Sequence, residues 1–250
     1  MIFRWSIWGN HISKNIELLQ YSILSFKKQF GNNHQYVVYT DNAEYVKKYL
    51  NETADVRQFP TSKESLFFVT SKATWLKWCP SARLDKNQTE FFVDSDVFLL
   101  RYPKEIDLFL ANPNMKFAIM DEFLGQSWQH GSMHKRATPN TPYVNAGFFV
   151  QKIGCDISDD LIKEFKWWQK NIKDDEQTHH DEQGALAVSL TKYLVNKELC
   201  ILPKNTYMLI GENENTNIND LKDVTLLHAV YPDHPAFYKF KSFLDKILSK

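Results

Sequence analysis

The sequence predicts an α/β protein in which a central, mostly parallel mixed sheet is flanked by helices. Three observations support this fold class. Runs rich in β-branched and aromatic residues alternate along the chain with segments of helical periodicity. The apolar run at residues 91–100 is typical of a strand that is buried on both faces, as the strands of parallel sheets are. The 250 residues, of which 43% are hydrophobic, suffice for the core of one large domain.

The first half of the chain starts with a predicted strand at residues 2–8. A helix is expected next, because apolar residues recur at helical spacing until Gly31 and two asparagines end the pattern. A second strand at residues 36–40 ends at Asp41 and Asn42, which suit the N-cap of a short helix. Residues 64–78 predict a further helix, and the chain then passes Pro80 into the strand at residues 91–100.

The second half continues with a strand at residues 117–120 that ends in Asp121 and Glu122. Residues 125–142 form a predicted loop whose length indicates a functional role. A strand at residues 143–151, helices at 158–171 and 181–195, a polar loop at 212–223 and a strand at 225–228 follow. The last helix, at residues 236–248, has one apolar face, and packing on the core is favoured over contact with a membrane surface.

Composition excludes several classes of protein. Lys plus Arg equals Asp plus Glu at 30 each, so no net charge attracts nucleic acid or an anionic membrane. Cys79, Cys155 and Cys200 are odd in number and far apart, which argues against a disulfide framework and a cysteine zinc site. No stretch approaches the roughly 20 apolar residues of a transmembrane helix, and the N-terminus does not resemble a signal peptide. We therefore expect a soluble, cytoplasmic protein.

The sequence lacks both common glycine-rich phosphate loops. Neither G-x-G-x-x-G after a strand nor G-x-x-x-x-G-K-[ST] occurs, and the chain has only eight glycines. If such a protein binds a nucleotide diphosphate, a metal ion and basic side chains have to balance the phosphate charge.

Asp94 and Asp96 are the most informative residues, because they interrupt the apolar run 91–100. Two unpaired carboxylates at the edge of a buried strand repel each other and lose hydration. At spacing two their side chains share one face of a regular strand, and at its end they can converge on a hard cation. The alternative is that both acids only form or cap a turn.

His228 ends the apolar strand near the C-terminus. Its imidazole would complete a mixed nitrogen and oxygen site with Asp94 and Asp96, which suits Mn²⁺ or Mg²⁺. Alternatively, His228 is a buried histidine that is hydrogen-bonded to the backbone.

Two further motifs have both structural and functional interpretations. Asp181 and Glu182 begin a predicted helix, where Asp181 can be an N-cap or either acid can take a proton from an acceptor hydroxyl. Asn145, Ala146 and Gly147 begin a strand, where small residues let the backbone approach a ligand or a neighbouring helix. A zinc site built from His130, His134 and the pair His179 and His180 is disfavoured, because H-E-x-x-H is absent.

Taken in order, these motifs resemble those of metal-dependent glycosyltransferases of GT-A fold, especially family 8. The resemblance covers residues 2–239 and rests on the order of short motifs: Ser71-Lys72-Ala73, Val93-Asp94-Ser95-Asp96-Val97, Asn145-Ala146-Gly147, Asp181-Glu182-Gln183 and His228. The chain departs from the family where Glu182 separates Asp181 from Gln183. It departs again where His-x-x-Gly-x-x-Lys becomes His228 with His234-Pro235 and the more distant Lys239.

The resemblance implies a single Rossmann-like domain over residues 1–250, with a nucleotide-binding half at about 1–100 and an acceptor half at about 101–250. It implies that Mn²⁺ or Mg²⁺ on Asp94, Asp96 and His228 bridges the diphosphate of a nucleotide sugar, with UDP-sugars favoured. The acceptor would be a hydroxyl of a glycan or another molecule. The residues implied near the donor are Trp8, Gly9, Asp41, Lys72, Ser95, Asn145, Ala146, Gly147 and Lys239.

Three carboxylates could act as the base toward the acceptor hydroxyl: Asp181, Glu182 and Asp121. Two other classes of protein remain open. The same acids would serve a metal-dependent phosphohydrolase or nucleotidyltransferase, and in a carbohydrate-binding or scaffolding protein these motifs would only cap strands. The donor sugar and the stereochemical outcome do not follow from the sequence.

Overall fold

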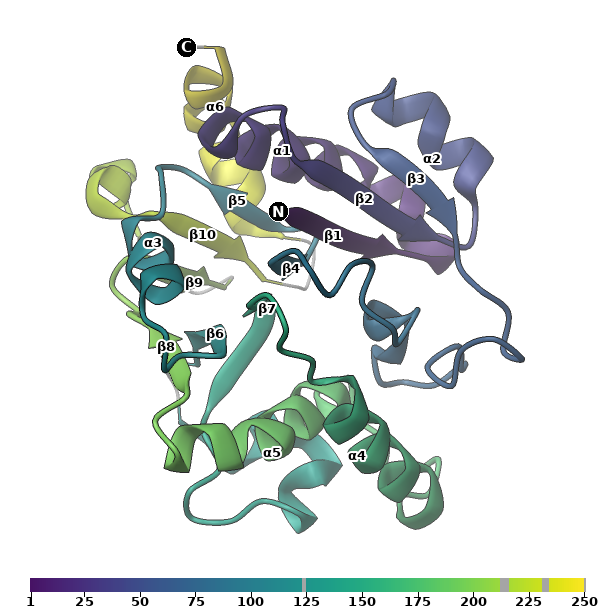
Figure 1. Ribbon diagram of the computed structural model, residues 1–250. Helices are drawn as coiled ribbons and strands as arrows, with labels where there is room; N and C mark the ends of the chain where they lie inside the picture. The colour runs from purple at the N-terminus through teal and green to yellow at the C-terminus, as the bar shows by residue number, and fades with distance from the viewer. Residues whose placement is uncertain (123–124, 212–215, 231–233, 250) are drawn as a thin grey trace.

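The computed structural model describes residues 1–122, 125–211, 216–230 and 234–249. A seven-stranded sheet has the order β3-β2-β1-β4-β7-β6-β8, and every strand except β7 runs in the same direction (Figure 1). Its strands are β1 (Ile2–Ile7), β2 (Gln35–Thr40), β3 (Asp55–Gln58), β4 (Glu90–Val93), β6 (Phe117–Asp121), β7 (Val144–Gln151) and β8 (Leu199–Leu202). The predicted mostly parallel mixed sheet is therefore confirmed.

A second sheet of three strands has the order β5-β10-β9. Its strands are β5 (Val97–Leu99), β9 (Tyr207–Ile210) and β10 (Leu226–Ala229). β10 runs antiparallel to β5, with His228 opposite Val97. This pairing brings His228 on β10 close to the end of β4, because β5 begins four residues after Val93.

Six α-helices surround the sheets in the described part of the chain (Figure 1). They are α1 (Ile12–Phe30), α2 (Ala43–Leu50), α3 (Lys104–Ala111), α4 (Ser158–Asn171), α5 (Asp181–Val195) and α6 (Pro235–Ser249). Four 3-10 helices occur in the same residues, at Gly9–His11, Trp75–Trp78, Ser127–Lys135 and Ile218–Asp223. No described helix has the length and apolar character needed to cross a membrane.

Local signals in the sequence begin and end these helices. The side chain of Asn42 accepts a hydrogen bond from Tyr45 N at the start of α2, as an N-cap does. After α1, Gly31 adopts φ +84°, and its N–H donates to the carbonyl of Lys27. Since left-handed backbone favours glycine, Gly31 ends α1 where the sequence predicts.

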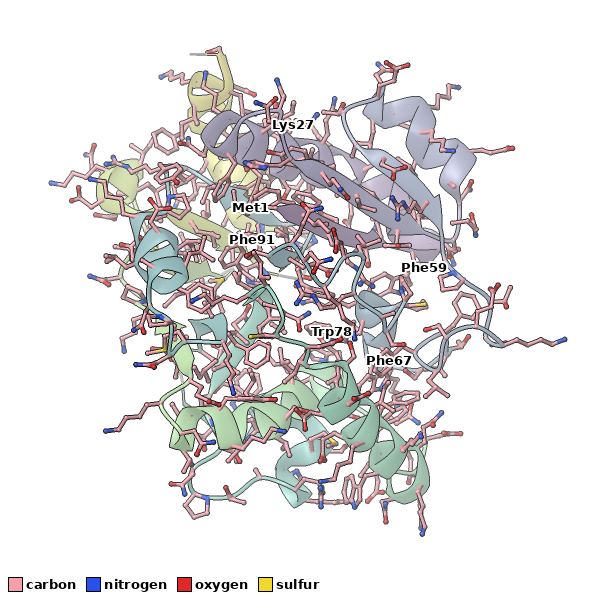
Figure 2. The ribbon with its side chains drawn as sticks, in the orientation of Figure 1. Met1, Lys27, Phe59, Phe67, Trp78 and Phe91 are labelled. Atoms are coloured by element: carbon pink, nitrogen blue, oxygen red, sulfur yellow. The ribbon has the colours of Figure 1, made fainter. Side chains whose placement is uncertain are left out.

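Each face of the central sheet has its own apolar core. On one face, α4, α5 and the segment that carries Phe67 and Trp78 cover the strands (Figure 2). On the other face, α1, α2 and α3 pack on Phe3, Trp5 and Phe91. A third cluster joins the small sheet to α6 through Phe237, Phe240 and Leu244, so the last helix packs on the core as expected.

Four expectations about secondary structure are wrong. Residues 64–78 contain only the 3-10 helix Trp75–Trp78, because their aromatic residues reach the core from successive turns instead of from one helix face. Residues 91–100 are two strands in different sheets. The predicted loop at 125–142 contains a 3-10 helix with a kink at Gly131, and the loop at 212–223 contains another, although residues 212–215 lie outside the described part. The short elements β3, α3, β8 and β9 were not predicted, since their patterns are too brief to recognise.

Candidate metal and donor site

The candidate site is built on a tight turn between β4 and β5. Val97 N donates to the carbonyl of Asp94 at 3.2 Å, so residues 94–97 form the turn by which the chain leaves the central sheet. Asp94 N donates to the carbonyl of Gly147 on β7, and Ala229 N on β10 donates to the carbonyl of Asp96, each at 2.9 Å. We had expected the two acids to share one face of a single strand, but they lie at the turn between two strands. The turn itself brings their side chains together.

Two buried serines of α1 stabilise this turn and the start of β5 by hydrogen bonds to the backbone. Ser22 Oγ donates to the carbonyl of Val97 at 2.5 Å and accepts from Trp5 Nε1 at 2.9 Å. Ser25 Oγ accepts from Leu99 N at 2.9 Å. These hydroxyls satisfy backbone groups that the break between the two sheets would leave without partners. Their signal in the sequence is a pair of serines within the apolar stripe of a helix.

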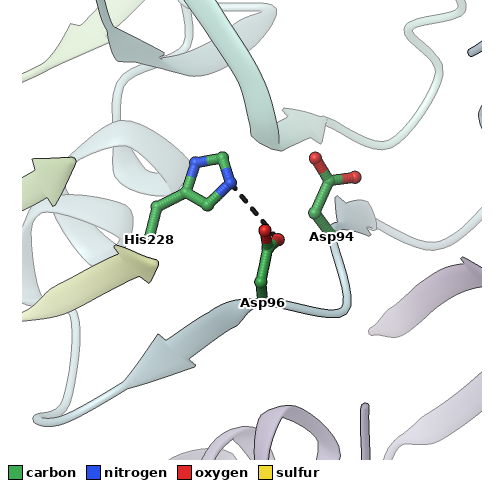
Figure 3. Close-up of side chains that lie close together, drawn as sticks. All are labelled: Asp94, Asp96 and His228. Carbon is green, nitrogen blue, oxygen red and sulfur yellow. Dashed lines mark ion pairs between the residues drawn. The ribbon is translucent and has the colours of Figure 1, made fainter. Parts of the chain in front are cut away.

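Asp94, Asp96 and His228 lie close together at this turn (Figure 3). Each offers one ligand atom, and these atoms lie within 4.8 Å of one another. The side chains of Asp96 and His228 are 11% and 7% exposed, whereas that of Asp94 is 33% exposed, so the cluster opens to solvent on the Asp94 side. It is the one such group of at least three potential ligands that we find among the described residues.

The hydrogen bonds of Asn145 orient the imidazole of His228. Asn145 Nδ2 donates to Glu122 Oε2 at 3.1 Å, while Asn145 Oδ1 accepts from Gly147 N at 2.8 Å. That oxygen also lies 3.0 Å from His228 Nδ1, which must therefore carry the proton. The second ring nitrogen, Nε2, is left to face Asp96 Oδ1 at 3.3 Å.

This arrangement fits a divalent cation. A neutral imidazole with its proton on Nδ1 directs the Nε2 lone pair at the carboxylate of Asp96, so a proton or a metal ion is needed between the two atoms. Two carboxylates and one imidazole form a donor set suited to Mn²⁺, and a hydrogen bond to the distal ring nitrogen is how proteins orient a histidine ligand.

Gly147 is required by the position of the His228 ring. A Cβ atom at Gly147 would lie 2.4 Å from His228 Cε1 and 2.8 Å from Asn145 Oδ1. The sequence predicts that small residues here allow a close approach. In the structure, the approaching group is the imidazole of His228.

His234 is a second imidazole at the cluster. Its Nδ1 lies 2.8 Å from the carbonyl of Ala229 and 3.1 Å from Asp96 Oδ2, so this nitrogen carries a proton. Burial alone would raise the pKa of Asp96, but the contacts with His228 and His234 outweigh it and hold the pKa of that carboxyl well below its usual range. Asp96 is thus ionised and available as a ligand.

Lys77 is the basic residue that the structure brings to the cluster. Its Nζ lies 2.7 Å from Asp94 Oδ1 and 2.8 Å from Oδ2, and its side chain is 8% exposed. Lys72, which the resemblance implies, is exposed and has no recorded polar contact among the described residues. The signal for Lys77 is a single cation between Trp75 and Trp78, both of which are buried.

Asp181 and Glu182 lie inside the protein rather than at an open edge. Asp181 accepts hydrogen bonds from Ser132 N at 2.7 Å and Trp168 Nε1 at 2.7 Å, and from Thr178. Glu182 accepts from Trp78 Nε1 at 2.6 Å and Thr74 Oγ1 at 3.0 Å. Burial raises the pKa of Glu182. The hydrogen bonds of Asp181 and Glu182 attach the start of α5 to the segments that pack against it.

The remaining predicted residues lie in several places. Gly9, with φ +71°, donates its N–H to Asp41 Oδ2 at 2.9 Å, which joins the carboxyl ends of β1 and β2. Ala146 N donates to Gln183 Oε1 at 3.1 Å, so the acid-Gln motif contacts the Asn-Gly strand. The others are Trp8, which is half-buried beside Phe59, Ser95 in the turn, Asp121 at the end of β6, and Lys239, which is exposed on α6.

Two other features lie apart from the cluster. His130 and His134 contact the carbonyls of Pro142 and Gly131, and they form no group of metal ligands among the described residues. A pocket of about 450 Å³ lies beside the first residues of β2 and β3, at the opposite edge of the sheet from the Asp94 turn. It contains none of the predicted site residues.

Three known structures with a similar fold are glycosyltransferases. The galactosyltransferase LgtC, solved with donor and acceptor sugar analogues, is 12% identical, with a TM-score of 0.58 over 100% of this chain and 95% of LgtC. Mouse xyloside xylosyltransferase 1 is 12% identical, with a TM-score of 0.55 over 91% of this chain and 96% of its own. The bifunctional glycosyltransferase WbbM is 11% identical, with a TM-score of 0.53 over 100% of this chain and 52% of its own.

No protein-family model matches the sequence, and no curated protein matches it. At 11–12% identity the structural similarity establishes the fold alone. The expected GT-A architecture is thereby confirmed.

Proposed function

We propose that this protein is a glycosyltransferase that moves a sugar from a nucleotide-diphosphate sugar, in the first instance a UDP-sugar, to a hydroxyl of a glycan or another acceptor. The convergence of Asp94, Asp96 and His228 at the carboxyl end of β4 is the observation that carries the proposal. In open α/β sheets, ligands bind at the carboxyl ends of the strands. The fold shared with known glycosyltransferases adds support.

Asp94, Asp96 and His228 would hold Mn²⁺ or Mg²⁺. Bound there, the cation would offset the negative charge of the departing nucleoside diphosphate. The chain itself offers a second positive charge at this place, the ammonium of Lys77. No glycine-rich loop is needed in such a site, in agreement with the eight glycines of the sequence.

The linked pair of Gly9 and Asp41 would bind the nucleoside of the donor. Both residues lie at the carboxyl ends of the first two parallel strands, the same edge of the sheet as the Asp94 turn. The exposed carboxylate of Asp41 can accept hydrogen bonds from ribose or base. Trp8 is half-buried beside them and offers an aromatic ring for stacking.

Among the three acids proposed as the base, burial favours Asp121. A base must come within hydrogen-bond reach of the acceptor hydroxyl. Asp121 is partly exposed at the end of β6, where it pairs with Val144 at the edge that carries the cluster. Asp181 and Glu182 are 0% and 4% exposed, and their hydrogen bonds are directed to other parts of the protein.

Isothermal titration with UDP and Mn²⁺ tests the proposal. We expect UDP to bind tightly only when Mn²⁺ is present, and an Asp94→Ala/Asp96→Ala variant to lose that dependence. Equal binding by the wild type and the variant would refute a site built on these acids.

A panel of nucleotide sugars without acceptor identifies the reaction. Metal-dependent release of a nucleoside diphosphate is expected for at least one donor. Release of pyrophosphate, or hydrolysis of simple phosphoesters, would instead indicate a nucleotidyltransferase or a phosphohydrolase that uses the same acids.

A further inference from the structure

Lys77 engages the whole carboxylate of Asp94. Its ammonium lies 2.7 Å from one oxygen and 2.8 Å from the other, so neither oxygen is free of it. The lysine side chain is 8% exposed, whereas that of Asp94 is 33% exposed. The contact is therefore made from the protein side, and solvent reaches Asp94 from the opposite side.

One ammonium faces more than one acid here. Lys77 contacts both oxygens of Asp94, and the carboxylate of Asp96 belongs to the same cluster. The charge balance leaves an excess of negative charge, which favours a further cation at the cluster.

The backbone that carries Lys77 is held in place. Glu182 on α5 accepts hydrogen bonds from Thr74 Oγ1 and Trp78 Nε1, the N-cap and the last residue of the 3-10 turn. The carbonyl of Lys77 accepts from Ser6 Oγ on β1 at 3.3 Å. Any movement of the ammonium therefore comes from rotation of the flexible lysine side chain.

These contacts place two cations in competition for Asp94. A divalent ion that uses an Asp94 oxygen would lie close to the ammonium, because hard cations bind carboxylate oxygens at about 2.0–2.6 Å. Like charges at such separation repel. A lysine side chain can relieve the repulsion by rotating, whereas the hydrogen-bonded His228 cannot turn away without losing Asn145.

We propose that Lys77 is a tethered counter-ion that neutralises Asp94 in the metal-free protein and is released from at least one carboxylate oxygen when the divalent cation binds. The released ammonium then meets the diphosphate of the donor. Lys77 would thus impose an order of binding in which the metal ion binds first and the nucleotide binds second. This inference rests on the proposed function.

The test compares Mn²⁺ binding by the wild type and Lys77→Met, measured from the electron paramagnetic resonance signal of free Mn²⁺. Methionine keeps most of the length of the side chain but removes the competing charge. We expect Lys77→Met to bind Mn²⁺ about tenfold more tightly, which corresponds to about 1.4 kcal/mol. Lys77→Gln, which can still donate a hydrogen bond to Asp94, should show the same direction of change.

Lys166→Met is the matched control, because this exposed lysine of α4 loses the same charge. We expect its Mn²⁺ affinity to equal that of the wild type. In a second measurement at saturating Mn²⁺, Lys77→Met should bind UDP about tenfold more weakly, since the ammonium is missing. Opposite changes in the two affinities are not expected from a purely structural defect.

Unchanged or weaker Mn²⁺ binding by both Lys77 variants would overturn the counter-ion role while leaving the proposed function intact, provided that the wild type binds Mn²⁺ and UDP. A wild type that binds neither Mn²⁺ nor UDP would refute the proposed function, and the inference with it.

Discussion

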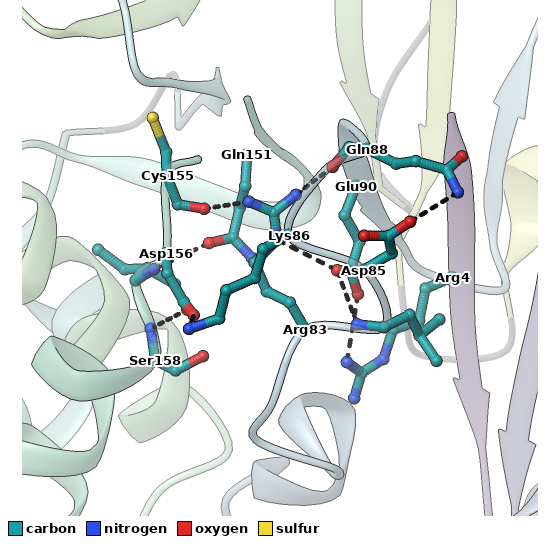
Figure 4. Close-up of polar contacts among 12 residues, drawn as sticks. Arg4, Arg83, Asp85, Lys86, Gln88, Glu90, Gln151, Cys155, Asp156 and Ser158 are labelled. Atoms are coloured by element: carbon teal, nitrogen blue, oxygen red, sulfur yellow. Dashed lines mark hydrogen bonds and ion pairs between the residues drawn. The ribbon is translucent and has the colours of Figure 1, made fainter. Parts of the chain in front are cut away.

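Carboxylates lie at both ends of β4, but their negative charges are compensated in different ways at the two ends. At the first residue, Glu90 is fully buried between two arginines, with Arg4 Nη1 at 3.5 Å and Arg83 Nε at 3.4 Å (Figure 4). Beyond the last residue, Asp94 and Asp96 converge on each other and on His228 (Figure 3).

The arginines at the first end are themselves held on several sides. Arg4 donates to the carbonyl of Pro80 at 2.7 Å and lies against the rings of Tyr39 and Phe92. Arg83 donates to backbone carbonyls of the β4 approach and of the turn after β7, namely those of Gln88, Lys152 and Cys155. This network joins segments of the backbone and leaves Glu90 without access to a ligand.

The comparison separates a structural acid from a candidate functional one. Both ends place carboxylates within a largely apolar environment, where each charge needs compensation. At Glu90 the compensation comes from buried arginines. At Asp94 and Asp96 the acids outnumber the nearby lysine, and one side is open to solvent. Excess charge in an accessible place indicates a ligand-binding site.

The largest effect is expected from Glu90→Gln, which leaves two buried arginines without their acidic partner. Breaking a buried ion pair in this way costs about 3–5 kcal/mol of folding free energy. Urea denaturation measures it. The control, Glu17→Gln at an exposed position on α1, should change stability by less than about 0.5 kcal/mol. A loss below about 1 kcal/mol for Glu90→Gln would contradict the structural role.

Asp96→Asn should have the opposite profile. It removes a proposed metal ligand, so we expect the rate of donor turnover to fall by about 10²–10³-fold. The free energy of unfolding of the metal-free protein should fall by less than it does for Glu90→Gln, because asparagine keeps the volume of Asp96 and its amide oxygen can still accept from His234 Nδ1. Full activity, or a loss of unfolding free energy as large as that of Glu90→Gln, would contradict the different roles assigned to the two ends of β4.

Gly147→Ala tests the position of His228. The added methyl group would clash with the imidazole, so the ring has to shift from Asn145. We expect about 10- to 100-fold weaker Mn²⁺ binding, the usual effect of losing the support of a ligand. Gly211→Ala is the control, because its Cβ would meet only Val230 Cγ2 at an ordinary 3.6 Å. Equal Mn²⁺ binding by both variants would show that His228 is not a ligand.

The smallest effect is expected from the pH dependence that Glu182 contributes. Burial raises its pKa in the folded protein above the unfolded value of about 4.3. Its contribution to stability is therefore present in full below about pH 4.3 and is lost as the pH rises through the folded pKa. Urea midpoints of the wild type and Glu182→Gln, compared from pH 4 upward, should show a steeper fall for the wild type. Parallel curves would argue against this shift.

Much of the site could be predicted from local sequence patterns, because charged or polar residues within an apolar run are conspicuous in a sequence. Asp94 and Asp96 stand out in an apolar run, and His228 ends another. We did not predict Lys77 as a site residue, because the helix that we expected at residues 64–78 does not form. In the 3-10 turn, Trp75 and Trp78 enter the core, and their packing decides which lysine faces Asp94.

The sequence by itself determined the alternation of strands and helices, the α/β class and the identity of the acids, since these depend on periodicity and on the cost of charge in an apolar run. Only the tertiary structure decided how they meet. The pairing of β5 with β10 brings His228 to Asp96, and β7 supplies Asn145 and Gly147 to orient it. Contacts between residues far apart in the chain depend on which strands pair. No local pattern encodes that choice.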